Sequence, residues 1–294
     1  MLTIVMYVMK PNLNDIKIQL DEVEKKILSI LDNTNLSNYV LSNKNILSSG
    51  KMLRSKLVQY LGLTTGTDKN ILSTAGAAVD IMHSASLIHD DVIDGGLLRR
   101  GNPTFWKKYG VNGAILFGDT LMFRSIALLT NQPRVDLLEE LINMTGKVCT
   151  SEAEQELILR GIPGNWNDCE KIARFKTGSL FAFSAVAGGS GDINEANSLR
   201  EAGFELGTVY QIADDILDSS GKNEIAGKTL GKDLERGKTT AITAMNGAPN
   251  SPRKYLYEML ESSSKRLVEY PNLYDSWSYY IEKEFNPIIN QFIN

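Results

Sequence analysis

The segment that most limits the folds open to this chain is residues 83–101, HSASLIHDDVIDGGLLRRG. Its carboxylates, Asp90, Asp91 and Asp94, follow an apolar run that is typical of a buried helix. On a helix, Asp90 and Asp94 share a face, where their charges repel one another and resist the loss of water. A divalent cation resolves that conflict, and Mg²⁺ commonly binds one or two carboxylates together with water and substrate phosphate oxygens. Taken alone, the motif also fits a solvated acidic helix end.

A second acidic motif, YQIADDILD, repeats the first one near the end of another predicted helix. Asp214 and Asp218 have the same four-residue spacing, with Asp215 beside Asp214. Facing helices of a bundle commonly build metal sites from such side chains, so the two motifs predict one shared site. The loop that follows, residues 219–238, contains four glycines that each precede a lysine, a composition that suits closure over a polyphosphate.

Hydrophobic residues recur at helical spacing along most of the chain, without strand-like alternation of useful length. With 294 residues, 43% of them hydrophobic, the chain has enough apolar side chains for a substantial core. No linker marks a domain boundary, so we expect residues 1–294 to form a single all-α domain, a helical bundle around a central cavity. The expected helices cover residues 13–32, 71–94, 134–160, 168–189, 194–218 and 252–294 and the segment after Asp119. Residues 33–49 are expected to be a loop.

Charge and cysteine content exclude several classes of protein. The net charge of −4 gives no reason to expect a nucleic-acid partner. Cys149 and Cys169 lack the spacing of a metal site and fit a reduced, cytoplasmic protein. The apolar opening MLTIVMYVM is too short to cross a bilayer and lacks the basic residues of a secretion signal, so no membrane segment is expected.

Lysines and arginines accompany both acidic motifs in larger number than a metal site alone needs. Lys51 and Arg54 are three residues apart in GKMLR, so on a helix they share a face and can bind one anion. Arg99 and Arg100 follow the first acidic motif, and Lys176 lies in an otherwise apolar segment, where an isolated lysine is unusual. Carboxylates for Mg²⁺ and cations for phosphate oxygens together describe a diphosphate site. The apolar helices around it predict that the rest of the substrate is hydrocarbon.

Several motifs in one order carry a resemblance to a known family: GKMLR, HSASLIHDDVID, LLRRGNPT, FGD, FKTGSLF, YQIADDILD and GKTLGKDLERGKTT. From about Gly50 to Thr240 the sequence resembles the trans-isoprenyl diphosphate synthases, the polyprenyl synthetase family, and in particular its longer-chain members. The resemblance implies the isoprenoid-synthase type of helical bundle, Mg²⁺ as the cofactor, and a homodimer. It also implies head-to-tail condensation of isopentenyl diphosphate with an allylic diphosphate to a linear all-trans polyprenyl diphosphate.

The resemblance assigns roles to individual residues. The Mg²⁺ ligands that it implies are Asp90, Asp94 and Asp214, supported by Asp91, Asp215 and Asp218. The residues implied to bind the allylic diphosphate are Arg99, Lys176, Lys228 and Lys238. Those implied to bind isopentenyl diphosphate are Lys51, Arg54, His83 and Arg100. The catalytic candidates are Lys176, Thr177 and Gln211, the last two beside the allylic carbon, and the loop 219–238 is implied to close over the site and exclude water.

The length of the product is predicted from the helix that carries Asp90. A growing hydrocarbon tail runs down beside this helix, with Ser86 and its neighbour Ala85 one turn below Asp90 and Met82 two turns below. Relatives with short products commonly carry a bulky aromatic residue one turn below, whereas Ala85 and Ser86 are small and Met82 is flexible. We therefore expect a C25–C40 product, with geranylgeranyl diphosphate as the alternative. The residues expected to stop the tail are Met122, Phe123 and Ile126.

Three other functions fit parts of the sequence. A P-loop nucleotide-binding protein is excluded because five residues, and not four, separate Gly221 from Gly227. A catalytically silent subunit of a heteromeric synthase is expected to lack some of the aspartates or lysines that this chain keeps. A terpene cyclase shares the metal chemistry but needs no second diphosphate site, and GKMLR, His83 and Arg100 predict one here.

Overall fold

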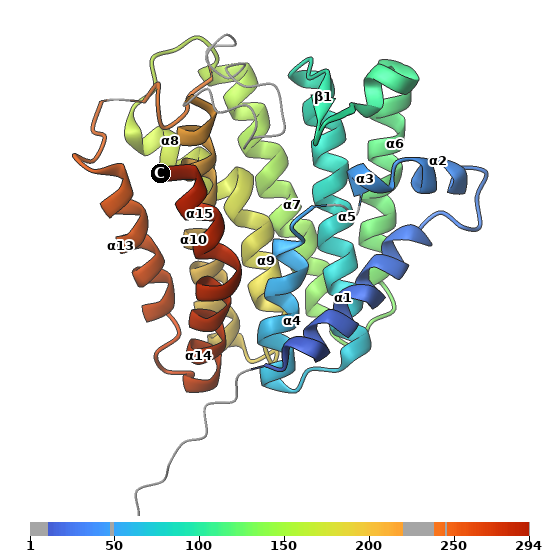
Figure 1. Ribbon diagram of the computed structural model, residues 1–294, viewed down its shortest axis with the longest axis horizontal. Helices are drawn as coiled ribbons and strands as arrows, with labels where there is room; N and C mark the ends of the chain where they lie inside the picture. The colour runs from blue at the N-terminus through green and yellow to red at the C-terminus, as the bar shows by residue number, and fades with distance from the viewer. Residues whose placement is uncertain (1–10, 48–49, 220–237, 245, 294) are drawn as a thin grey trace, which may run out of the picture.

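The computed structural model describes residues 11–47, 50–219, 238–244 and 246–293, which form a bundle of α-helices (Figure 1). The all-α prediction is confirmed. Five helices pack against one another at the centre of the bundle: α4 (Leu53–Thr65), α5 (Lys69–Ile93), α7 (Asp136–Glu154), α9 (Ser179–Ala187) and α10 (Ile193–Ser219).

Outer helices cover this centre on two sides (Figure 1). On one side, α1 (Leu13–Leu28) and α6 (Phe105–Leu129) pack against α5. On the other side lie α13 (Pro252–Lys265), α14 (Pro271–Tyr280) and α15 (Asn286–Ile293), and α8 (Trp166–Ala173) precedes α9. The helices expected from the periodicity are therefore present, with ends shifted by a few residues and with interruptions described below.

Two segments differ from the sequence prediction. Residues 33–49, expected to be a loop, contain the short helices α2 (Ser37–Ser42) and α3 (Lys44–Leu47), which bury Val40 and Leu47. After α5 the chain forms a small hairpin of two antiparallel strands, β1 (Leu98–Arg99) and β2 (Asn102–Pro103). Arg100 and Gly101 make its turn, both with positive φ, as two-residue hairpin turns require.

Three π-helical turns interrupt the predicted helices: η1 (Gln155–Leu159), η2 (Arg174–Gly178) and η3 (Ile281–Phe285). A π-turn changes the direction of the side chains that follow and frequently occurs at functional sites. The turn η2 carries both Lys176 and Thr177, two of the catalytic candidates.

Helices α9 and α10 touch through their backbones. A Cβ atom at Gly203 would lie 2.5 Å from the Cα of Ala182, and one at Gly207 would collide with the backbone of Gly178. Real Cβ atoms do not approach other atoms so closely, so glycine is required at both positions. This close approach packs η2, with Lys176, against α10.

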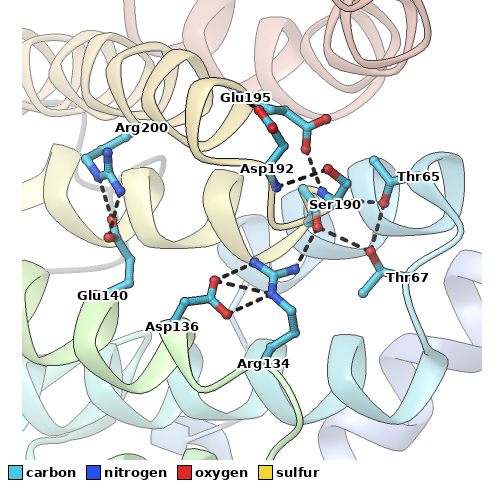
Figure 2. Close-up of polar contacts among 11 residues, drawn as sticks. Thr65, Thr67, Arg134, Asp136, Glu140, Ser190, Asp192, Glu195 and Arg200 are labelled. Atoms are coloured by element: carbon cyan, nitrogen blue, oxygen red, sulfur yellow. Dashed lines mark hydrogen bonds and ion pairs between the residues drawn. The ribbon is translucent and has the colours of Figure 1, made fainter.

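A polar network ties the helices together at the end of the bundle where α4 and α9 finish and α7 and α10 start (Figure 2). Arg134 donates to the carboxylate of Asp136 at 2.7–3.2 Å and to the carbonyl of Gly189 at 2.9 Å. Thr67 donates to the same carbonyl at 3.2 Å. The acidic residues of α5 lie at the opposite end of that helix, so this network is structural rather than part of their site.

Two of the described helices, α5 and α6, are long and apolar enough to cross a membrane by length and composition alone. In α5, 83% of the apolar window is buried, as in a core helix, whereas in α6 28% is buried. Core helices of soluble proteins pass the same test, so this is weak evidence for a membrane segment.

We expect Gly207→Ala to lower the free energy of unfolding by about 1–3 kcal/mol, because the added methyl overpacks a backbone contact. Urea denaturation followed by circular dichroism measures this change. Gly146→Ala on α7 is the matched control: nothing lies within 4 Å of its added methyl, and alanine favours a helix by up to about 1 kcal/mol. Equal stability of the two variants would contradict the close contact between α9 and α10.

Candidate active site

A cavity of about 330 Å³ lies between α5, α6, α7 and α9, beside the first acidic motif. Asp90, Glu152 and Lys238 line its charged end. An apolar cavity below a charged end fits a ligand with an anionic head and a hydrocarbon tail. Its apolar lining includes Met82, Met122, Val148, Leu157 and Leu180.

Asp90 and Asp94 lie at the end of α5, as their spacing predicts. The Nζ of Lys238, whose side chain is 6% exposed, lies 2.7 Å from the Oδ1 of Asp94. Burial raises the pKa of Asp90 to about 6, and the neighbouring carboxylates add to this effect against the opposing charge of Lys176. A further cation bound beside Asp90 would favour the charged form of this carboxylate against the effect of burial.

Lys176 lies between two carboxylates. Its Nζ is 2.6 Å from the Oε1 of Glu152. Burial opposes the charge of Lys176, but Asp90 and Glu152 outweigh that effect and raise its pKa, so the side chain stays protonated. Sequence reasoning missed Glu152, because acidic residues at alternate positions of this helix gave no signal that one of them faces a cavity.

The guanidinium of Arg99 pairs with the carboxylate of Asp91. The Nε of Arg99 donates to both carboxylate oxygens at 2.9 Å, and its Nη2 donates to Oδ1 at 2.8 Å. Such two-point pairs fix the guanidinium plane. The contact anchors the β-hairpin to α5, and the role of Arg99 in binding the allylic diphosphate stays a prediction.

The second acidic motif supports the catalytic candidates. The Oδ1 of Asp215 accepts a hydrogen bond of 2.8 Å from the Nε2 of Gln211, and its Oδ2 accepts one of 3.0 Å from the backbone of Ala241. The amide oxygen of Gln211 in turn accepts the hydroxyl hydrogen of Thr177. Thr177 and Gln211 are thus brought together as predicted, and Asp215 sets the orientation of the amide.

The structure does not bring Asp90, Asp94 and Asp214 together as a finished metal site. Within residues 11–47, 50–219, 238–244 and 246–293, no three His, Cys, Asp or Glu side chains form a group that could hold a metal. Lys238 lies against Asp94, and Lys176 lies in the field of Asp90 and Asp94. The side chain of Asp218, Lys228 and residues 220–237 of the predicted lid lie outside the described residues.

A second group of cations surrounds the start of α4. The Arg54 guanidinium lies 4.8 Å from the centre of the Phe181 ring, and burial lowers its pKa. Burial, together with the charges of Arg54, Arg100 and Arg99, lowers the pKa of His83 well below its usual value, so His83 is neutral. Burial also lowers the pKa of Lys51, which lies within the field of Asp214. Of the four residues predicted to hold one anion, Arg54 and His83 are half-buried, whereas Lys51 and Arg100 are exposed.

The backbone around these cations is strained. Met52 and Arg100 are the two described non-glycine residues with positive φ, 48° and 51°. Gly50 approaches the Arg100 guanidinium so closely that a Cβ at that position would lie 2.6 Å from its NH2. Strained residues of this kind commonly cluster at functional sites.

Sequence reasoning also missed Asp80 on α5 and Tyr280 on α14. The carboxylate of Asp80, which is 8% exposed, accepts a hydrogen bond from the hydroxyl of Ser55. Burial raises the pKa of Asp80 to about 6 against the opposing effects of Ser55 and the nearby arginines. The hydroxyl of Tyr280 donates to the carbonyl of Leu53 at 2.9 Å, so the C-terminal helices support the first turn of α4.

A family model described as polyprenyl synthetase matches residues 38–276. The chain belongs to the polyprenyl synthetase family. A geranylgeranyl diphosphate synthase from Mycobacterium tuberculosis is 34% identical over 210 residues, which are 68% of this chain and 59% of that relative. A geranylfarnesyl diphosphate synthase from Methanosarcina mazei is 39% identical over 58% of each chain. The chain thus spans less than two thirds of the length of these two curated relatives.

Solved structures have the same fold. A geranyltranstransferase from Thermotoga maritima superposes with a TM-score of 0.75 and 26% identity over 94% of this chain and 99% of that one. A geranylgeranyl pyrophosphate synthetase from Pyrococcus horikoshii gives 0.69 and 26% identity over 95% of this chain and 90% of that one.

The FGD motif, residues 117–119, positions His89. Gly118 leaves room for the His89 ring, which a Cβ would overlap. The Nε2 of His89 lies 3.1 Å from the carbonyl of Ile115 and 3.4 Å from the Oδ1 of Asp119. These contacts join α5 to α6 beside the cavity, which His89 also lines.

The cavity corrects one of the predicted chain-length residues. Ser86 and Met82 line it, but Ala85 does not. Ala85 is fully buried in the apolar cluster between α1, α5 and α6, because successive residues of a helix point about 100° apart. Of the residues expected to stop the tail, Met122 lines the cavity, whereas Phe123 is 73% exposed and Ile126 is not part of the lining.

We expect the stability of Asp80→Asn relative to the wild type to rise with pH. Between about pH 4 and pH 6 the folded protein holds a proton on Asp80 that the unfolded chain has released, so wild-type stability falls by up to about 3 kcal/mol across this window and stays lower above it. Asparagine carries no charge and avoids this loss.

Denaturant titrations of both proteins at pH 4, 6 and 8 measure the difference. Asp136→Asn is the control of opposite sign, because the hydrogen bond from Arg134 lowers the pKa of Asp136. A difference for Asp80→Asn that is constant with pH would contradict the raised pKa.

Proposed function

We propose that the protein is a trans-prenyltransferase that condenses isopentenyl diphosphate head-to-tail with an allylic diphosphate and forms a linear polyprenyl diphosphate. The observation that carries this proposal is the presence of two separate groups of cations, one at the acidic end of the cavity and one at the start of α4. Lys176 and Lys238 accompany the acidic end of the cavity, and Arg54 and Arg100 lie at the start of α4. The names of the two curated relatives, both prenyl diphosphate synthases, agree with it.

We further propose that Asp90 and Asp94 bind a divalent cation, Mg²⁺. Both carboxylates project from one face of α5, and their all-oxygen donor set suits a hard cation. Burial of Asp90 without a sufficient positive charge favours such a ligand. When bound, the cation would supply charge neutralisation for the leaving diphosphate. Asp214 on α10 would be a further ligand for such a cation.

The residues of the chain then act on both substrates. Lys176 and Lys238 neutralise the departing diphosphate, so the C–O bond breaks and leaves an allylic cation. The oxygens of Thr177 and Gln211 favour that cation. Arg54 and Arg100 hold isopentenyl diphosphate so that its double bond attacks the cation, and a proton then passes to the departing diphosphate.

The depth of the cavity favours the shorter alternative for the product. Met82 lies two helical turns below Asp90, about 12 Å away, and is the deepest residue of α5 in the lining. An extended isoprene unit measures roughly 5 Å, from four bonds of about 1.5 Å each, so this depth holds two to three units. With the first unit beside the carboxylates, we propose geranylgeranyl diphosphate, C20, as the main product rather than C25–C40.

A terpene cyclase is the second candidate, because it would use the same acidic end of the cavity. Arg54 and Arg100 near α4 argue against it, since a cyclase has no second diphosphate to hold. Incubation of the pure protein with geranyl diphosphate alone and then with isopentenyl diphosphate separates the two functions. A cyclase forms product from the first substrate alone, whereas the synthase needs both.

The homodimer stays a proposal. Its support is the exposed apolar face of α6, where Val111, Ile115, Leu116 and Phe123 are 42–73% exposed. Sedimentation analysis of the pure protein tests it.

We expect Asp90→Ala and Asp214→Ala each to lower turnover by roughly a hundredfold or more, because each removes charge that organises the leaving diphosphate. Product formation from labelled isopentenyl diphosphate measures the effect, and circular dichroism checks the fold. Asp21→Ala, on the exposed face of α1, is the control. Turnover near the wild-type level in either variant, or full activity after removal of divalent cations, would refute the metal assignment.

We expect Ser86→Phe to shorten the product to three units or fewer, because the ring fills the cavity one turn below Asp90. Met82→Ala should lengthen it by at least one unit, since each further buried CH₂ gains about 0.8 kcal/mol. Chromatography of the dephosphorylated products measures both effects. Asn143→Phe puts the same ring on the exposed side of α7 and should change nothing. An unchanged length distribution in both cavity variants would show that the tail runs elsewhere.

A further inference from the structure

The first turn of α4 lacks a cap of its own. Its N-cap residue, Met52, has a left-handed conformation and makes no side-chain hydrogen bond to the helix. The first N–H groups of a helix need acceptors from outside, particularly in a buried position. Leu53 and Ser55, in this first turn, are both buried.

Asp80, from the neighbouring helix α5, supplies the missing acceptor. Its carboxylate accepts hydrogen bonds from the hydroxyl and from the backbone of Ser55, the third residue of α4. A carboxylate at this position also interacts favourably with the positive end of the helix dipole. Asp80 therefore takes the place of an N-cap side chain for α4.

The same carboxylate lies within the field of two arginines. Asp80 is attracted to Arg54, which is half-buried, and to Arg100, which follows the first acidic motif. Arg54 and Arg100 repel each other, and Arg99 repels Arg100. Without Asp80, no carboxylate at this position would offset the repulsion between the two like charges, and their side chains would tend to move apart.

We propose that Asp80 is a positioning residue that holds Arg54, Arg100 and the GKMLR turn in the arrangement that binds the diphosphate of isopentenyl diphosphate. The inference rests on the proposed function, since it specifies how one of the two substrate sites is organised. Asp80 touches neither the reacting atoms nor the cavity that takes the allylic tail. Its effect should therefore appear in the binding of one substrate and not of the other.

Because Asp80 is negatively charged, the direction in which its neutralisation changes substrate binding distinguishes two mechanisms. A carboxylate that acted only through its field would repel a diphosphate, so its neutralisation would tighten binding. A carboxylate that organises the arginines would have the opposite effect, because the loss of charge-assisted hydrogen bonds and of the attraction to both arginines weakens the site. The sign of the change in KM for isopentenyl diphosphate thus separates the two mechanisms.

The experiment compares Asp80→Asn, Asp80→Glu and Ser55→Ala with the wild type, with the KM of each substrate measured separately. For Asp80→Asn we expect the KM for isopentenyl diphosphate to rise roughly tenfold to a hundredfold and the KM for geranyl diphosphate to stay within about twofold. Asp80→Glu, which keeps the charge, should restore most of the affinity. Ser55→Ala keeps the carboxylate and removes one donor, so it should give a smaller rise of the same kind.

Glu140→Gln is the matched control, since Glu140 is a buried carboxylate paired with Arg200 at 2.8–2.9 Å. It should leave both KM values unchanged. A lower or unchanged KM for isopentenyl diphosphate in Asp80→Asn, or an equal rise for both substrates, would overturn the inference. If Asp80→Asn does not fold, an unchanged KM in Ser55→Ala overturns it instead. A wild-type protein that forms no product from the two diphosphates would refute the proposed function, which is a different outcome.

Discussion

Carboxylates buried at the end of an apolar helix need positive charge nearby, and several parts of this structure supply it. Lys176 comes from the π-turn η2, and Lys238 from a segment that follows α10. The glycine contacts between α9 and α10 let η2 pack closely against α10, which carries Gln211 and Asp215. The close packing of α9 against α10 and the charge balance at the cavity therefore depend on each other.

The two groups of cations differ in their chemistry, and this difference supports the proposed assignment of the substrates. At the acidic end of the cavity the lysines lie against carboxylates, so a diphosphate needs a cation between itself and Asp90 or Asp94. At the start of α4 the arginines lie beside a neutral His83, and a diphosphate can bind them directly. The first place suits a leaving group, whose charge has to be neutralised, and the second suits a diphosphate that stays attached.

The sequence was informative where a function depends on local spacing and weak where it depends on distant contacts. The four-residue spacing of Asp90 and Asp94 predicted their common face, and the periodicity predicted the main helices. Asp80 escaped notice because its partner, Ser55, belongs to another helix. Ala85 was expected to lie beside the tail together with Ser86 because the chain alone does not show which side of α5 faces the cavity. Burial and helix orientation decide both cases.

Two carboxylates with a raised pKa mark the two proposed substrate sites, Asp90 within the first acidic motif and Asp80 outside both motifs. Among the described residues, Asp80 and Asp90 are the carboxyl groups whose pKa is raised to about 6, mainly by burial. Each such group lowers the stability of the folded state at neutral pH, so a protein keeps it where another requirement outweighs the loss. One lies at the acidic end of the cavity and the other among the arginines near α4. The two carboxyl groups that lower stability in this way thus lie at the two places where the proposed reaction holds a diphosphate.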